Sequence, residues 1–190
     1  SLRPQSLEPE TGRPAAPELR PFPRDQKLPL SFAQERLWLT YKLVPDSPMY
    51  NLPAVVRLSG PLDTGALERS LNEITRRHEV LRTKFPFVDG RPVQEIAPAG
   101  ELRLEAVDCT AWPEAEREAR AREAISAEAQ RAFDLEHDSM FRAALFRLGP
   151  QDHVFVLTLH HIISDAWSMN ILIGELGALY EAFTHGRPSP

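Results

Sequence analysis

Cysteine, excess basic charge and long apolar runs are scarce in this sequence, and each scarcity excludes a class of protein. The 190 residues include one cysteine, Cys109, which excludes an internal disulfide and a cysteine-based metal cluster. No stretch approaches the roughly 20 apolar residues that span a membrane, and the N-terminus lacks a secretory signal pattern. The net charge is −5, which does not favour nucleic acid as a partner. These features predict a cytoplasmic protein with no metal site, no membrane contact and no nucleic-acid contact.

Proline, in contrast, is abundant, and it concentrates near the N-terminus. Six of the 18 prolines fall within residues 1–27, among scattered charges and few apolar side chains. Because proline removes backbone donors and favours extended chain, this segment is predicted to be an interdomain linker. Residues 28–186 are predicted to form one folded unit. Residues 187–190 are predicted to begin a connection to a further part of a larger polypeptide.

Four helices are predicted from capping residues and apolar spacing. Ser31 and Gln34 have the spacing of a capping box. Asp63 can cap a second helix, and Pro113 opens a third that is rich in alanine, glutamate and arginine. Apolar residues recur at helical spacing over 172–183 and indicate the last helix.

Strand candidates alternate with these helices along the chain. They include residues 54–58, 93–96 and 102–107. Asp89-Gly90 predicts a tight hairpin, and residues 149–152 predict a second hairpin between two longer strands. Hairpins produce antiparallel neighbours, whereas interleaved helices allow parallel ones. The predicted fold class is therefore α/β, with a mixed sheet in a two-layer sandwich.

A pair of histidines follows the most apolar run of the chain. The run Val154–Leu159 has the length of a strand that is buried on both faces, and His160 and His161 stand at its end. Asp165 follows four residues later. A neutral histidine where a buried strand meets a loop can accept or relay a proton near neutral pH, as acyl transfer requires. The alternative is a core histidine that is satisfied by a backbone carbonyl.

Three segments carry a resemblance to a known family. Leu30–Trp38 has the sequence LSFAQERLW, Arg77–Phe85 has RHEVLRTKF, and His160–Ser168 has HHIISDAWS. In this order they resemble the first three core motifs of condensation domains from nonribosomal peptide synthetases. Tyr50–Pro53 and Phe133–Glu136 also resemble that family between the motifs. The amino-acid sequences of the motifs are most similar to those of the subtype that joins two L-configured building blocks.

The resemblance implies a fold and a reaction. The family has two lobes, each similar to chloramphenicol acetyltransferase, and the motifs of the second lobe are absent from this sequence. Residues 28–186 would thus be an N-terminal lobe, with the missing C-terminal lobe and the upstream and downstream peptidyl carrier domains as partners. No cofactor is expected to bind directly, because substrates arrive as thioesters on the phosphopantetheine arms of the carriers. The isolated lobe is expected to be inactive, since the substrate channel runs between the lobes.

By resemblance, His161 is the catalytic residue of this lobe. Two roles are open for it, because it can deprotonate the attacking amine or only orient it. A thioester is already activated, so the site mainly has to position two arms and manage one proton. His160 lies on the opposite face of the strand by alternation and is expected to support the site or the core.

Three further positions complete the expected site. The resemblance implies that Asp165 points away from the substrate and pairs with Arg77, with Arg82 as a competing partner. A buried carboxylate beside the site would be costly without such a guanidinium partner. Ala166 departs from the glycine that usually follows the motif aspartate. Alanine costs about 1 kcal/mol or more there if the backbone angle φ is positive, and little if φ is negative.

Two other functions stay open from the sequence. A condensation domain with a degenerate histidine motif would serve as a non-catalytic module that docks carriers or other partner proteins, with Ala166 marking the lost activity. A free-standing acyltransferase that uses coenzyme A thioesters would need trimerisation to complete its site. The proline-rich linker argues against this last reading.

Overall fold

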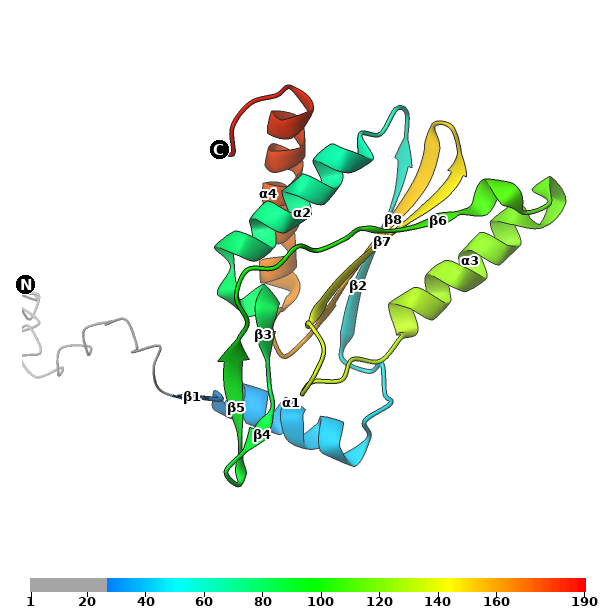
Figure 1. Ribbon diagram of the computed structural model, residues 1–190. Helices are drawn as coiled ribbons and strands as arrows, with labels where there is room; N and C mark the ends of the chain where they lie inside the picture. The colour runs from blue at the N-terminus through cyan, green and yellow to red at the C-terminus, as the bar shows by residue number, and fades with distance from the viewer. Residues whose placement is uncertain (1–26) are drawn as a thin grey trace, which may run out of the picture.

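Four α-helices, two short 3-10 helices and two sheets form the part of the chain that the computed structural model describes, residues 27–190 (Figure 1). The predicted linker, residues 1–27, lies outside the described residues except for Lys27. The elements in chain order are β1 (Leu28–Pro29), α1 (Phe32–Leu43), β2 (Asn51–Ser59), α2 (Thr64–Arg77), η1 (Glu79–Arg82), β3 (Thr83–Lys84), β4 (Phe87–Val88), β5 (Arg91–Ile96), β6 (Glu105–Asp108), η2 (Cys109–Ala111), α3 (Glu114–Gln130), β7 (Phe141–Gly149), β8 (Asp152–His160) and α4 (Ala166–Thr184). Within residues 27–190, no helix combines the length and the apolar character that crossing a bilayer requires.

The larger sheet has the strand order β2-β8-β7-β6. β8 pairs antiparallel with both β2 and β7, whereas β6 pairs parallel with β7. β8 therefore lies inside the sheet, and all its residues after Asp152 are buried. The predicted mixed α/β sheet is confirmed, and the histidine pair stands at the end of a strand with neighbours on both sides.

Helices cover both faces of this sheet (Figure 1). Strand side chains alternate between the faces. On one face, Leu145 and Leu157 join a core that includes Leu71 of α2 and Leu176 of α4. On the other face, a smaller cluster joins Ala121 of α3 to Ala144, Phe146, Val154 and Val156 of the sheet. The sheet thus has a third layer beyond the two that the sequence predicts.

The smaller sheet joins the short strands β1, β3 and β4 to β5. Asp89 and Gly90 form the predicted hairpin turn with φ of 51° and 80°, so both adopt the left-handed region that this turn requires. Trp38 of α1 ties the sheet to the core. Its indole N–H donates to the Phe85 carbonyl at 2.9 Å, and its ring stacks on Phe87 with a centroid distance of 5.4 Å.

The helix starts are confirmed where side chains reach the backbone locally. Ser31 and Gln34 form the predicted capping box of α1, and the Asp63 carboxylate accepts the Ala66 N–H at 2.8 Å. Pro113 is the N-cap residue of α3 but makes no side-chain hydrogen bond there, so the start of α3 rests on proline alone. Each of these contacts spans three residues or fewer, so the sequence contains all the information that they need.

Two local predictions, a strand boundary and the buried face of a helix, are wrong in part. The strand predicted over 102–107 begins only at Glu105, because the N–H groups of Leu102 and Leu104 donate to side chains of α2 instead of a neighbouring strand. On α1, helical spacing groups Ala33 with Leu37 and Tyr41 on one predicted apolar face, but Ala33 is exposed and Trp38 is buried. Both differences come from tertiary partners that the local pattern does not contain.

Candidate active site

The turn after β8 carries the histidine pair and is held from both neighbouring strands. The His160 N–H donates to the Met140 carbonyl at 3.0 Å, next to the start of β7. The His161 N–H donates to the Tyr50 carbonyl at 2.8 Å, next to the start of β2. The Ile163 N–H closes the turn onto the His160 carbonyl at 3.1 Å. The backbone beneath the histidines is therefore anchored on two sides.

His161 is exposed, and its ring is fixed by one hydrogen bond. Its Nδ1 lies 2.6 Å from the carbonyl oxygen of Ser164. A carbonyl oxygen can only accept, so Nδ1 carries the proton and donates it. In the neutral ring this leaves Nε2 as an acceptor. The arrangement thus presents an unprotonated ring nitrogen at an exposed turn, as a general base or an amine-orienting group requires.

His160 has the opposite environment and the opposite tautomer. It is 5% exposed, and its Nδ1 accepts the Ile162 N–H at 3.1 Å, so a neutral ring carries its proton on Nε2. Tyr50 and Phe133 lie against it with ring-centroid distances of 6.1 and 5.9 Å. Burial, with smaller electrostatic contributions, lowers the pKa of His160 to about 4. His160 is therefore buried and neutral, whereas the His161 ring is exposed and hydrogen-bonded through Nδ1 alone.

Arg142 packs against Phe133, one of the two rings around His160. It was not singled out from the sequence. Its guanidinium carbon lies 3.7 Å from the centre of the Phe133 ring, and it donates to the Arg131 carbonyl at 2.6 Å. It also pairs with Glu128 at 3.2 Å. The Asn51 amide donates to the carbonyl of Ala129, in the last turn of α3, and to that of Arg131, just after the helix, at 2.9 Å each. The end of α3 is thereby fastened to the strands that hold the turn.

Asp165 is exposed and caps α4. Its carboxylate accepts the Ser168 N–H at 2.8 Å and the Ser168 hydroxyl. These hydrogen bonds, the hydroxyl first, hold the pKa of the Asp165 carboxyl below its usual value. Ala166 is the first residue of α4. Among residues 27–190, Asp89 is the only non-glycine residue with positive φ, so Ala166 carries no left-handed strain.

The expected ion pair between Asp165 and Arg77 does not form. Arg77 pairs with Glu73 at 2.9 Å, one helical turn earlier on α2. Hydrogen bonds from Arg76 first, and also from Arg77, lower the pKa of Glu73 to about 2. Residues four apart on a helix are always within reach of each other. The Asp165 carboxylate is already engaged by Ser168, so local partners satisfy both members of the expected pair.

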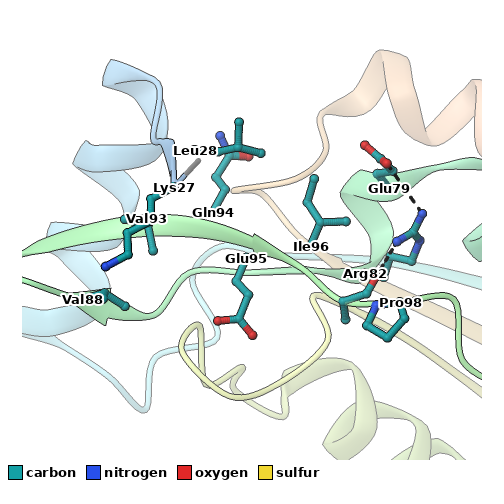
Figure 2. A pocket seen from close by; sticks show the side chains of 11 residues that line it. Lys27, Leu28, Glu79, Arg82, Val88, Val93, Gln94, Glu95, Ile96 and Pro98 are labelled. Carbon is teal, nitrogen blue, oxygen red and sulfur yellow. Dashed lines mark hydrogen bonds and ion pairs between the residues drawn. The ribbon is translucent and has the colours of Figure 1, made fainter. Parts of the chain in front are cut away.

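Arg82, the competing partner, also points elsewhere. It donates to the Ala97 carbonyl and lies 3.9 Å from Glu79. Arg82, Glu79 and Ala97 line an open cavity of about 650 Å³ beside β5. Figure 2 shows Arg82 and Glu79 among the residues around it. Residues 160–165 do not line this cavity, so it is separate from the histidine turn.

The second motif also contacts α4, and residues of the second and third motifs line one cavity. His78 Nε2 lies 2.8 Å from the Glu175 carboxylate and joins the end of α2 to α4. A cavity of about 210 Å³ lies beside the histidine turn, between the two motifs. Its lining is mostly apolar: His78, Val80, Leu81, Leu159, Ile163, Ser164, Ser168, Ile171 and Leu172.

Other groups that bear chemistry are dispersed in the described part of the chain. No cluster of three or more His, Cys, Asp or Glu side chains within residues 27–190 is arranged to hold a metal ion. Cys109 is buried, and burial raises the pKa of its thiol. A protonated buried thiol is a poor nucleophile, which agrees with a structural role.

Comparison with known proteins identifies relatives along almost the whole chain. The family profile described as "Condensation domain" matches residues 24–190. A linear gramicidin synthase protein of Brevibacillus parabrevis is 51% identical over 166 residues, which cover 87% of this chain and 2% of that protein. The dimodular nonribosomal peptide synthase of Bacillus subtilis (strain 168) is 43% identical over 173 residues, 91% of this chain and 7% of that protein. The chain therefore spans only a few per cent of these curated relatives.

Solved structures share the fold. The first condensation domain of the calcium-dependent antibiotic synthetase, in complex with a substrate analogue, aligns with a TM-score of 0.74 and 27% identity over 87% of this chain and 39% of its own. The X-domain in complex with OxyB from teicoplanin biosynthesis aligns with a TM-score of 0.79 and 34% identity over 95% of this chain and 37% of its own. The match to about two fifths of each solved chain corresponds to one lobe.

Proposed function

The chain belongs to the condensation-domain family of nonribosomal peptide synthetases, and we propose that it supplies the histidine-bearing lobe of a domain that forms peptide bonds. The observation that carries the proposal is the state of His161. Its Nδ1–H is held by the Ser164 carbonyl at 2.6 Å, so that in the neutral ring Nε2 is the acceptor, on an exposed turn. A ring protonated on both nitrogens would have no acceptor to offer the amine.

The proposed reaction joins two thioester-bound substrates. The amine of the acceptor aminoacyl group attacks the carbonyl carbon of the donor acyl or peptidyl thioester. A C–N bond forms, the C–S bond breaks, the donor arm leaves as a thiolate that gains a proton, and the nitrogen loses one. His161 Nε2 either takes that proton or orients the amine by accepting its N–H. His160, Asp165 and Ala166 support the turn and touch no reacting atom.

The partners follow from the same proposal. The donor and acceptor groups arrive on phosphopantetheine arms of an upstream and a downstream carrier domain, and a C-terminal lobe supplies the other wall of the channel. The amino-acid sequences of the motifs fit the subtype that joins two L-configured residues best. The chain by itself is expected to form no product, because a single lobe leaves the arms without a complete channel to position them.

A single-turnover assay on the intact condensation domain tests this function. Donor and acceptor carriers are loaded, mixed with the domain, and the new amide is measured by mass spectrometry. Wild type is expected to give product and His161→Ala to lose it, whereas the matched control His185→Ala, an exposed histidine at the far end of α4, keeps the wild-type rate. Full activity in His161→Ala would refute the proposal.

A second candidate is a docking module without condensation activity. The observation that favours it is the 34% identity to the X-domain, whose solved structure is a complex with OxyB. This candidate predicts that the intact domain binds a carrier or another partner protein but forms no amide. Product from the purified wild-type domain would contradict it. Product from Ala166→Gly alone would show instead that alanine at this position has silenced the site.

A further inference from the structure

The Gln34 side chain makes contacts in two directions. Its Oε1 accepts the Ser31 N–H at 2.9 Å and so completes the capping box of α1. Its Nε2 donates to the Ile162 carbonyl at 3.3 Å, across 128 positions of sequence. Ile162 directly follows His161. A residue that local rules assign to helix capping therefore also contacts the turn that presents the candidate catalytic histidine.

The contact with Ile162 requires an amide. A capping box works with glutamine or glutamate, since the Ser31 N–H needs only an acceptor. The Ile162 carbonyl, in contrast, needs a donor, and an ionised glutamate has none. Glutamate at this position would also place a carboxylate oxygen against a carbonyl oxygen. The second contact thus accounts for glutamine at position 34, where helix capping alone would accept either residue.

Ile162 is also bound from the opposite side. Its N–H donates to His160 Nδ1 at 3.1 Å, inside the buried pocket. Two residues further on, the Ser164 carbonyl accepts the Nδ1–H of His161. A shift of Ile162 would therefore carry Ser164 away from His161, since the two are joined by a short, tight turn.

We propose that Gln34 is a positioning residue that holds residues 161–164 so that the proton of His161 stays on Nδ1. It acts through the backbone and contacts no substrate. The effect of Gln34 on the reaction rate rests on the proposed condensation activity. Its effect on the tautomer of the His161 ring does not. Gln34 would thereby connect the first motif of the chain to the third.

The test compares Gln34→Glu with Ser31→Ala in the intact condensation domain. Ser31→Ala removes the hydroxyl that accepts the Gln34 N–H and leaves the Ile162 contact in place. Imidazole ¹⁵N spectra report the tautomer of His161, with His161→Gln used for assignment, and single-turnover assays report the rate and the half-saturating carrier concentration.

Gln34→Glu is expected to keep the helix cap but to shift His161 towards the Nε2–H tautomer. The single-turnover rate should fall about fivefold to tenfold, as for one lost hydrogen bond that aligns a reacting group. The half-saturating carrier concentration should change less than about twofold, because Gln34 does not bind the arms. Ser31→Ala should lower the melting temperature by about 2–4 °C and leave tautomer and rate unchanged.

An unchanged tautomer in Gln34→Glu would overturn the proposal, as would equal losses of rate in Gln34→Glu and Ser31→Ala. Absence of product from wild type, together with a shifted tautomer in Gln34→Glu, would refute the condensation activity and leave the positioning role standing. If Gln34→Glu does not fold, Gln34→Met, which has similar length but no amide and no charge, is measured in the same way. An unchanged His161 tautomer in Gln34→Met would equally overturn the proposal.

Discussion

The buried pocket around His160 and the exposed turn around His161 are one residue apart and differ in every property that matters for chemistry. His160 is enclosed by aromatic rings, and its pKa is lowered to about 4. His161 is exposed, and its ring is hydrogen-bonded only through Nδ1. A step of one residue at a strand end changes the face of the sheet, and with it the burial and the tautomer. Because both residues are histidines, residue type alone does not show which of them can act on a substrate.

His161→Ala should have the largest effect on activity. Loss of a positioned proton acceptor typically lowers a rate by about 10²–10⁴-fold, and we expect that range for condensation by the intact domain. The unfolding free energy should change by less than about 1 kcal/mol, because the exposed ring makes only one hydrogen bond. Single-turnover rates and urea unfolding of the same samples separate the two effects. A large loss of stability would mean that His161, too, is a core residue.

His160→Asn should change the pH dependence of stability. The folded state keeps His160 neutral down to about pH 4, whereas a histidine in the unfolded chain binds a proton near pH 6.5. Between these values the unfolded state binds more protons, so stability is complete above pH 6.5 and is lost as the pH falls towards 4. The loss from this residue amounts to about 3 kcal/mol.

Asparagine keeps an acceptor for the Ile162 N–H but does not titrate. We would measure the free energy of unfolding in urea at pH 7.5, 5.5 and 4.5 for wild type and His160→Asn. Other titrating groups should affect both proteins equally, so the free energy of unfolding should fall less in the variant as the pH is lowered. Identical declines in both proteins would show that His160 is not held neutral by its pocket.

Asp165→Ala should destabilise the protein by about 1 kcal/mol, as expected for a lost helix N-cap. A double-mutant cycle between Asp165 and Arg77 should give a coupling below about 0.3 kcal/mol, because the two residues have separate partners. A cycle between Arg77 and Glu73 serves as the control and should give about 0.3–0.5 kcal/mol. A coupling above 1 kcal/mol between Asp165 and Arg77 would restore the ion pair that the motif resemblance implies.

Ala166→Gly should have the smallest effect. Because φ at Ala166 is not positive, glycine relieves no strain, and the condensation rate should stay within about twofold of wild type. Glycine at the first turn of α4 should lower the unfolding free energy by less than about 1 kcal/mol. A tenfold gain in rate would contradict this and would implicate the alanine methyl in the channel.

Much of the fold and of the site was predictable because it depends on neighbours in sequence. The capping box at Ser31, the Asp89-Gly90 hairpin and the buried strand before His160 were predicted and are confirmed. The parallel pairing of β6 with β7 was not predicted, because that partner lies more than 30 residues away. Local hydrogen bonds and side-chain periodicity are encoded within a few residues, whereas long-range partners depend on how the elements pack.

The sequence by itself determined the mixed α/β class, the capped helix starts and the position of the histidine pair at the end of a buried strand. Only the tertiary structure decided which histidine is enclosed with a lowered pKa, that Arg82 reaches the Ala97 carbonyl, and that Gln34 reaches Ile162. The reason is physical: a side chain chooses among all donors and acceptors within about 3 Å of it, and packing brings most of those together from distant parts of the chain.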